Sequence, residues 1–159
     1  MRRPTRKAFA ALIAAVGLAL PALTPTPASA ATATSRFANY RYGDCLREHD
    51  ENELKSDRCD SGRGSILWHW NGKLNTNTTL KNYTWGRCLD SNDRGDVYPL
   101  PCNGGSYQKW RTVQPAPRSA IMLQSVGTGR CLYQQDNGYY RTARCDRGAQ
   151  NQRFTTGNF

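Results

Sequence analysis

The sequence has few of the residues and motifs on which catalysis depends. Its 159 residues include only two histidines, His49 and His69, and no Gly-x-Ser-x-Gly, phosphate-binding loop or Cys-x-x-Cys spacing occurs. Paired acids such as Asp93 and Asp96 fall in turn-like segments, where a solvated charge is the ordinary state. The sequence therefore predicts that the protein is not an enzyme and holds no metal or cofactor.

Helical periodicity and long apolar runs are also missing after residue 30. No window of about eleven residues repeats its apolar positions with the period of about 3.6 residues that a helix requires. Apolar segments are only about three to six residues long, and clusters of Gly, Asn, Asp and Pro separate them. This pattern is typical of short strands and turns, so we expect an all-β fold.

The first 30 residues have the composition of a secretory signal peptide. A basic start precedes the apolar run Ala8 to Leu20, and Ala28-Ser29-Ala30 fits the small-residue cleavage pattern. The apolar run is shorter than the roughly 20 residues that cross a membrane, which leaves a retained anchor as the weaker alternative. We therefore expect a secreted, extracellular protein without a membrane span, with a loose leader at residues 31–36 and one domain at residues 37–159.

The formal net charge of +10 falls once this segment is removed. Four basic residues leave with it, so 18 Lys and Arg face 12 acids in the remaining chain, which gives a charge of +6. These basic residues are dispersed along the chain, so the charge favours solubility over binding to nucleic acid.

The six cysteines fall on one lattice with a spacing of 43 residues. The first cysteines of the three copies are Cys45, Cys88 and Cys131, and the second cysteines are Cys59, Cys102 and Cys145. Cysteines of an exported chain meet an oxidising environment, which favours disulfides over a metal site. Among the roughly 15 possible pairings, the repeat selects the three within a copy, namely Cys45–Cys59, Cys88–Cys102 and Cys131–Cys145.

Apolar positions follow the same spacing and define a predicted core. Its members are Phe37, Leu80, Leu123, Leu46, Leu89, Leu132, Leu54, Val97, Tyr140, Trp68, Trp110 and Phe154. We expect about four strands in each copy and a closed arrangement with pseudo-threefold symmetry, because closure leaves no exposed sheet edge. Pro99 and Pro101 predict that the strand before Cys102 is an edge strand or is bulged, since proline cannot donate a ladder hydrogen bond.

Two stretches of the second copy make a more specific resemblance. Gly86-Arg87-Cys88-Leu89-Asp90 and Gln108-Lys109-Trp110 resemble the ricin B-type β-trefoil lectins, also called family 13 carbohydrate-binding modules. The resemblance covers residues 37–159. It implies a β-trefoil built from three repeats of about 43 residues, each with one disulfide and one shallow pocket for a sugar.

The family's pocket requires an Asp after the Cys-Leu pair, an aromatic ring two residues before the second cysteine, and polar side chains at and before the Gln of Gln-x-Trp. In the second copy Leu100 stands at the aromatic position, and Tyr98 is a possible replacement ring. In the third copy Tyr133 and Ala143 replace the Asp and the aromatic residue, and the first copy retains none of the pocket residues. The resemblance therefore implies a sugar-binding set, most of it in the second copy, of Asp90, Tyr98, Tyr107, Gln108, Asn151 and Gln152.

Each of these residues also has a structural interpretation. Asp90 is suited to holding the turn that follows it, and the two glutamines are suited to bonding backbone between copies. The tyrosines are compatible with ordinary half-buried strand positions.

Three functions remain open from the sequence. The first is a monomeric, non-catalytic protein that binds glycans through a shallow pocket in the second repeat. The alternative is a trefoil scaffold that has lost sugar binding and recognises a protein partner, as a toxin-associated subunit or an inhibitor. The third, electrostatic binding to an acidic polymer, is permitted by the positive charge alone.

Overall fold

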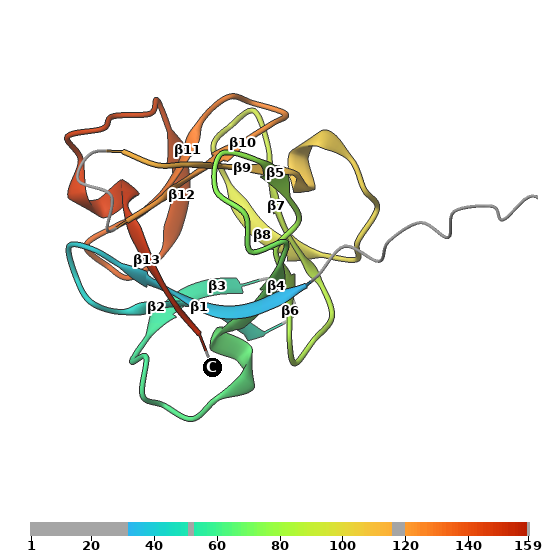
Figure 1. Cartoon of the computed structure of the whole chain (residues 1–159), viewed down its shortest axis with the longest axis vertical. Helices are drawn as coiled ribbons and strands as arrows, with labels where there is room; N and C mark the ends of the chain where they lie inside the picture. Colours follow the sequence, from blue (N-terminus) through green and yellow to red (C-terminus); the bar gives the residue numbers. More distant parts are fainter. Residues whose placement is uncertain (1–31, 51–52, 116–119, 159) are drawn as a thin grey trace, which may run out of the picture.

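The computed structural model describes residues 32–50, 53–115 and 120–158, and the predicted signal peptide lies outside these ranges. Within them the chain forms thirteen strands and three short 3₁₀ helices, η1 to η3 (Figure 1). None of the helices in these ranges has the length and apolar character needed to span a membrane.

The elements follow the repeat. The first copy contains β1 (Ala33–Asn39), β2 (Cys45–Asp50), β3 (Glu53–Asp57), η1 (Gly64–Ile66) and β4 (Leu67–Trp70). The second contains β5 (Asn77–Thr78), β6 (Lys81–Asn82), β7 (Cys88–Ser91), β8 (Val97–Leu100), η2 (Ser106–Gln108) and β9 (Trp110–Val113). The third contains β10 (Met122–Ser125), β11 (Cys131–Gln134), β12 (Tyr140–Ala143), η3 (Gln150–Gln152) and β13 (Phe154–Asn158).

All strand pairs are antiparallel and belong to two sheets. One runs β3-β2-β1-β4-β6-β7-β8 with β13 paired to β1, and the other runs β12-β11-β10-β9-β5. Neither sheet closes on itself, which corrects the closed arrangement expected from the sequence: the ladder is interrupted at Thr79 and Leu80, between β5 and β6. The two sheets also meet where Ile121 and Phe154 exchange two backbone hydrogen bonds of 2.8 Å.

The predicted core is confirmed. One buried cluster contains every predicted core residue except Val97, which packs against it half-buried. The indole Nε1 of Trp68 donates to the carbonyl of Leu46 at 2.9 Å, and that of Trp110 donates to the carbonyl of Leu89 at 2.9 Å. The closing tryptophan of a repeat is thus tied to the Cys-Leu strand of the same repeat, so burial leaves its only donor satisfied.

All three disulfides join the predicted partners, Cys45–Cys59, Cys88–Cys102 and Cys131–Cys145. The shared glycine before each first cysteine has a positive φ, for example 79° at Gly43 and 68° at Gly86. A residue with a Cβ is strained in that region, which explains why glycine recurs there in all three copies.

Equivalent polar residues join one repeat to the next. Asn39, Asn82 and Ser125 lie 43 residues apart, at the end of the first strand segment of each copy. The Nδ2 of Asn82 donates to the carbonyl of Ser65 at 2.9 Å, and that of Asn39 donates to the carbonyl of Asn151 at 2.8 Å. The Asn82 bond joins the second repeat to the first, and the Asn39 bond joins the first repeat to the third.

The N-terminal segment differs from expectation. Residues 31–36 were expected to form a loose leader, but Ala33 to Arg36 belong to β1 and pair with β4 from Trp70 to Leu67. Figure 1 shows β1 near its partner strands β2 and β4, with β13 beside it. The segment is ordered because Ser35 is fully buried and its Oγ accepts a hydrogen bond of 3.0 Å from Trp70 Nε1.

Candidate functional site

In the second repeat, Asp90 and Gln108 are in direct contact. The Gln108 Nε2 donates to Asp90 Oδ2 at 2.9 Å and to the carbonyl of Pro101 at 3.1 Å, while its Oε1 accepts from the backbone N–H of Asn103 at 2.8 Å. Gln108 is fully buried, and Asp90 is 5% exposed. Gln108 therefore orients Asp90 and offers no surface of its own. The turn after Asp90 is held by Asn92, whose Oδ1 accepts from the N–H of Asp96.

The register of β7 and β8 places Tyr98 beside Asp90. The two residues are Cα partners, so their side chains share one face of the hairpin. The pairing is regular through Pro99, and β8 is the last strand of its sheet, as the prolines predicted. The ring at Tyr98 therefore reaches the face of Asp90 without any shift of the strand.

Tyr107 lies at the open edge of the same region. Its hydroxyl donates to Asp93 Oδ2 at 2.8 Å, and its ring packs against Gly127 of the third repeat. The hydrogen bond to Asp93, followed by that residue's charge, raises the pKa of Tyr107 above its usual range. The structure thus brings together Asp90, Tyr98, Tyr107 and Gln108 on the second repeat.

The equivalent region of the third repeat is a hollow of about 400 Å³. It is lined by one aromatic residue and five polar ones, namely Tyr133, Gln135, Asp136, Asn137, Asn151 and Arg41. Tyr133 occupies the position of Asp90. Asn151, a predicted site residue, lines the hollow, and its Nδ2 donates to the carbonyl of Gln134 at 3.2 Å. Arg41 comes from the first repeat, so the two ends of the chain form this hollow together.

Gln152 is not part of that hollow. It is 5% exposed, its Oε1 accepts from the N–H of Asp146 at 2.9 Å, and its Nε2 donates to the carbonyl of Arg144 at 3.0 Å. These bonds repeat the ones that Gln108 makes to its own loop. Both glutamines therefore attach the loop after the second cysteine to the 3₁₀ helix.

Of the six lining residues, only Asn151 belonged to the predicted sugar-binding set. Tyr133 was noted as the replacement of the family's Asp, and Arg41, Gln135, Asp136 and Asn137 were missed. Tyr42, next to Arg41, donates to Asp136, and Arg41 Nη2 lies 3.8 Å from the same carboxylate. The carboxylate of Asp136 raises the pKa of Tyr42 above its usual range, chiefly through the hydrogen bond. These contacts bind the first-repeat loop to the third repeat. Only the Asp-Asn-Gly turn at residues 136–138 marked this region in the sequence.

In the first repeat an internal ion pair fills the corresponding region. Arg47 and Asp57 stand at the positions of the pocket Asp and the stacking ring, and Arg47 Nη1 lies 3.2 Å from Asp57 Oδ2. The Nε of Arg47 also donates to Ser65 Oγ at 3.2 Å, and Arg63 lies 3.5 Å from Asp57. The residues that replace the pocket chemistry therefore satisfy one another.

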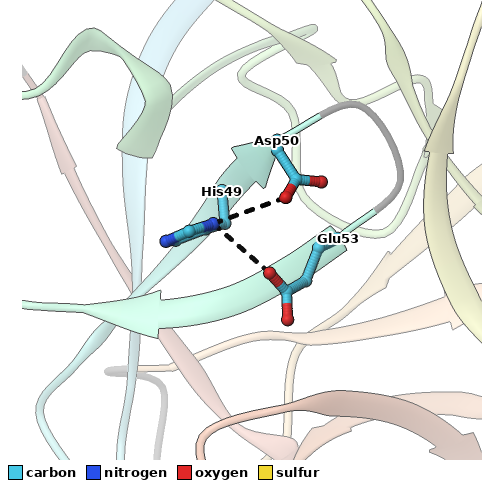
Figure 2. A group of neighbouring side chains, drawn as sticks. All are labelled: His49, Asp50 and Glu53. Carbon is cyan, nitrogen blue, oxygen red and sulfur yellow. Dashed lines mark ion pairs between the residues drawn. The ribbon is translucent and has the colours of Figure 1, made fainter.

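A separate group of possible metal ligands occurs on the hairpin of β2 and β3. In Figure 2 two dashed lines join His49 to the carboxylates of Asp50 and Glu53, with Nδ1 3.7 Å from Asp50 Oδ2 and 3.3 Å from Glu53 Oε2. Their ligand atoms lie within 4.8 Å of one another, and His49 and Asp50 are exposed. Exposed acidic groups commonly gather in this way without a metal ion, and the sequence analysis did not select these residues.

Comparison with known proteins identifies the fold. No protein-family model and no curated protein matches the sequence. The solved structure of the BEL beta-trefoil does match, with a TM-score of 0.67 and 14% identity over 80% of this chain and 93% of that chain. The chain is a β-trefoil.

Two other solved structures resemble this β-trefoil. One is a lectin of Polyporus squamosus bound to a human-type influenza-binding epitope, with a TM-score of 0.66 and 16% identity over 79% of this chain and 49% of that chain. The other is the cytolethal distending toxin of Haemophilus ducreyi, with a TM-score of 0.61 and 17% identity over 86% of this chain and 87% of that chain. At these identities the similarity shows the fold alone.

Proposed function

We propose that this β-trefoil is a secreted, non-catalytic protein that binds carbohydrate through shallow surfaces of its second and third repeats. Its three disulfides suit an oxidising, extracellular environment. The Polyporus squamosus lectin, which shares the fold, is an example of a protein of this shape with a bound glycan epitope.

The observation that carries the proposal is the hollow of the third repeat. A sugar presents an apolar ring face and a rim of hydroxyl groups, so it suits a site with one aromatic side chain among planar polar ones. Tyr133 supplies the ring, and Asn137 and Asn151 supply amide donors and acceptors. The hollow is open and small, which favours weak binding to a terminal sugar over deep enclosure.

The second repeat supports the same function in a different arrangement. Asp90 accepts a hydrogen bond from Gln108 through one carboxylate oxygen, Oδ2, which holds the side chain in place and leaves Oδ1 to accept from a ligand. Tyr98 lies across the hairpin from it and supplies a ring. A carboxylate oxygen that accepts from sugar hydroxyls beside an aromatic face is the chemistry expected of such a site.

A glycan array with matched variants tests the proposal and separates the two repeats. Tyr133→Ala should abolish binding if the third repeat is the site, and Asp90→Ala should do so if the second is. Asp90→Asn is the control for folding, because an amide oxygen still accepts the Gln108 hydrogen bond. Tyr83→Ala is the control for loss of an aromatic ring, because it removes a more exposed ring outside both surfaces. Binding that survives in the double variant Tyr133→Ala with Asp90→Ala would reject these surfaces.

A protein-binding function is the second candidate, and the first repeat favours it. The Arg47–Asp57 ion pair leaves that repeat without a sugar pocket, while Trp85 and Tyr83 are 51% and 57% exposed in the neighbouring turn. Exposed tryptophan and tyrosine are enriched where proteins contact one another. A glycan array without any signal, together with a protein captured by the wild type and lost with Trp85→Ala, would select this function.

A further inference from the structure

The loop after Cys145 encloses a second hollow of the third repeat, of about 540 Å³. The two hollows use different residues of η3: Gln152 lines this one, and Asn151 lines the hollow that contains Tyr133. Its charged lining consists of Arg144, Arg147 and Asp146. The lining therefore has an excess of positive charge, and none of the predicted sugar-binding chemistry apart from the buried Gln152 contributes to it.

The first repeat provides an internal comparison. The same triplet occurs twice, as Arg58-Cys59-Asp60 and as Arg144-Cys145-Asp146. In the first repeat Arg58 donates two hydrogen bonds to Asp60, at 3.1 and 2.9 Å, so the arginine is engaged within the loop. Arg63 of the same loop lies 3.5 Å from Asp57. Both arginines of this loop therefore have a carboxylate partner.

The third repeat lacks these ion pairs. Asp146 instead accepts a hydrogen bond of 2.7 Å from the backbone N–H of Gly148, which holds the turn. Arg144 and Arg147 are exposed, and within the described part of the chain neither guanidinium has a hydrogen bond or ion pair. Both arginines are therefore available to an external anion.

Arg153 adds a third guanidinium beside this loop. Its Nη2 donates to the carbonyl of Arg147, which fixes it against the loop. Its Nε is buried and has no partner among the residues that the structure describes. A buried donor without a partner is unusual, but Arg153 does not line the hollow, so it supports the loop and is not counted among the anion-binding groups.

We propose that the Cys145 loop binds an oxyanion group, sulfate or carboxylate, carried by an acidic polysaccharide. The planar fork of arginine donates two parallel hydrogen bonds to such groups, and two unpaired arginines beside one hollow suit this chemistry. The polysaccharide identity rests on the proposed carbohydrate-binding function. The anion-binding step itself depends only on Arg144 and Arg147.

Binding measurements with charged and neutral forms of one polymer test the inference. Dextran sulfate or carboxymethyl dextran should bind the protein, and unmodified dextran should not. Tighter binding to sulfated than to carboxymethylated polymer would identify sulfate as the ligand group, and the reverse order would identify carboxylate. Single-stranded DNA should bind more weakly than either, and tighter binding of DNA would overturn the proposal.

The matched variants are Arg144→Gln with Arg147→Gln, and Arg58→Gln with Arg63→Gln. Both pairs remove the same charge, but only the first removes unpaired guanidiniums. We expect the first pair to weaken binding of the charged dextran at least about tenfold and the second to change it about twofold or less. Equal losses would show a nonspecific effect of charge and overturn the proposal. If Tyr133→Ala does not alter glycan binding, the proposed carbohydrate site in the third repeat is rejected, but the anion-binding proposal for the Cys145 loop is not.

Discussion

At the scale of single residues, buried polar side chains determine how each repeat is held together. Gln108 and Gln152 make the same two bonds to the loop of their own repeat. Ile66 takes their place in the first repeat and packs with Cys45 and Leu67. In the first repeat, apolar packing of Ile66 thus replaces the hydrogen bonds of the glutamine. The loop after Cys59 has the ion pairs Arg58–Asp60 and Arg63–Asp57.

Gln108→Ala should destabilise the protein strongly. The change removes three hydrogen bonds, leaves the buried Asp90 carboxylate without the one it accepts from Gln108 and opens a cavity, so we expect a loss of about 2–4 kcal/mol in the free energy of unfolding. Urea denaturation measures this loss. The control is Lys109→Ala, an exposed neighbour, which should cost no more than about 0.5 kcal/mol. Equal losses in the two variants would contradict the attachment role.

Glu48 predicts a pH dependence of stability. Its side chain is fully buried, and Arg87 Nε donates to its Oε1 at 2.6 Å. Burial raises the pKa of Glu48 above its usual range, and the hydrogen bond and charge of Arg87 oppose this only in part. The folded protein therefore holds the proton more tightly than the unfolded chain does. The stability that Glu48 contributes is fully present below its ordinary pKa of about 4.3 and is lost as the pH rises through the raised pKa.

Urea denaturation of wild type and Glu48→Gln at a series of pH values tests this sign. The stability of the wild type should fall relative to that of the variant as the pH rises from about 4 toward 7. Parallel pH profiles would show that Glu48 does not titrate differently in the folded and unfolded states.

At the scale of elements, each repeat is a pair of strands joined by a disulfide and terminated by an aromatic residue. The second and third repeats have the same register, with Cys88 opposite Leu100 and Cys131 opposite Ala143. The prolines of the second repeat thus leave the pairing unchanged. What differs between repeats is the side chain at a fixed backbone position, as with Asp90 and Tyr133.

Replacing Cys88 and Cys102 together with alanine should lower the free energy of unfolding by about 3 kcal/mol, because the closed loop of the unfolded chain is released. Cys131 with Cys145 should give a similar loss, since the sequence separation is 14 in both pairs. Chemical denaturation measures both variants. A loss confined to one repeat would contradict equivalent roles for the two disulfides.

At the scale of the whole molecule, the first strand connects the ends of the chain. β1 pairs with β2 and β4 of its own repeat and with β13 of the third. The hollow of the third repeat depends on this joint, because Arg41 follows β1 and its neighbour Tyr42 donates to Asp136. Contacts between the first and third repeats therefore support both the fold and the candidate site.

Two truncations test the place of β1 in the fold. A chain that begins at Thr32 should retain the stability of the domain, whereas one that begins at Phe37 loses the four residues paired with β4, the buried Ser35 among them. We expect the shorter chain to melt at least about 5 °C lower. Equal melting temperatures would support a loose leader at residues 31–36.

The sequence by itself determined the repeat, the disulfide pairing and the core, because each depends on residue types that recur at one spacing. Sequence reasoning also selected Asp90 and Tyr98, since a family motif and a strand position identified them. Only the tertiary structure decided the rest, because contacts between repeats have no periodic signature. It buried Gln108 and Gln152, placed Arg41 beside Tyr133, and left Arg144 and Arg147 unpaired where Arg58 and Arg63 are paired. These differences between repeats arise because different side chains occupy equivalent backbone positions and therefore make different contacts.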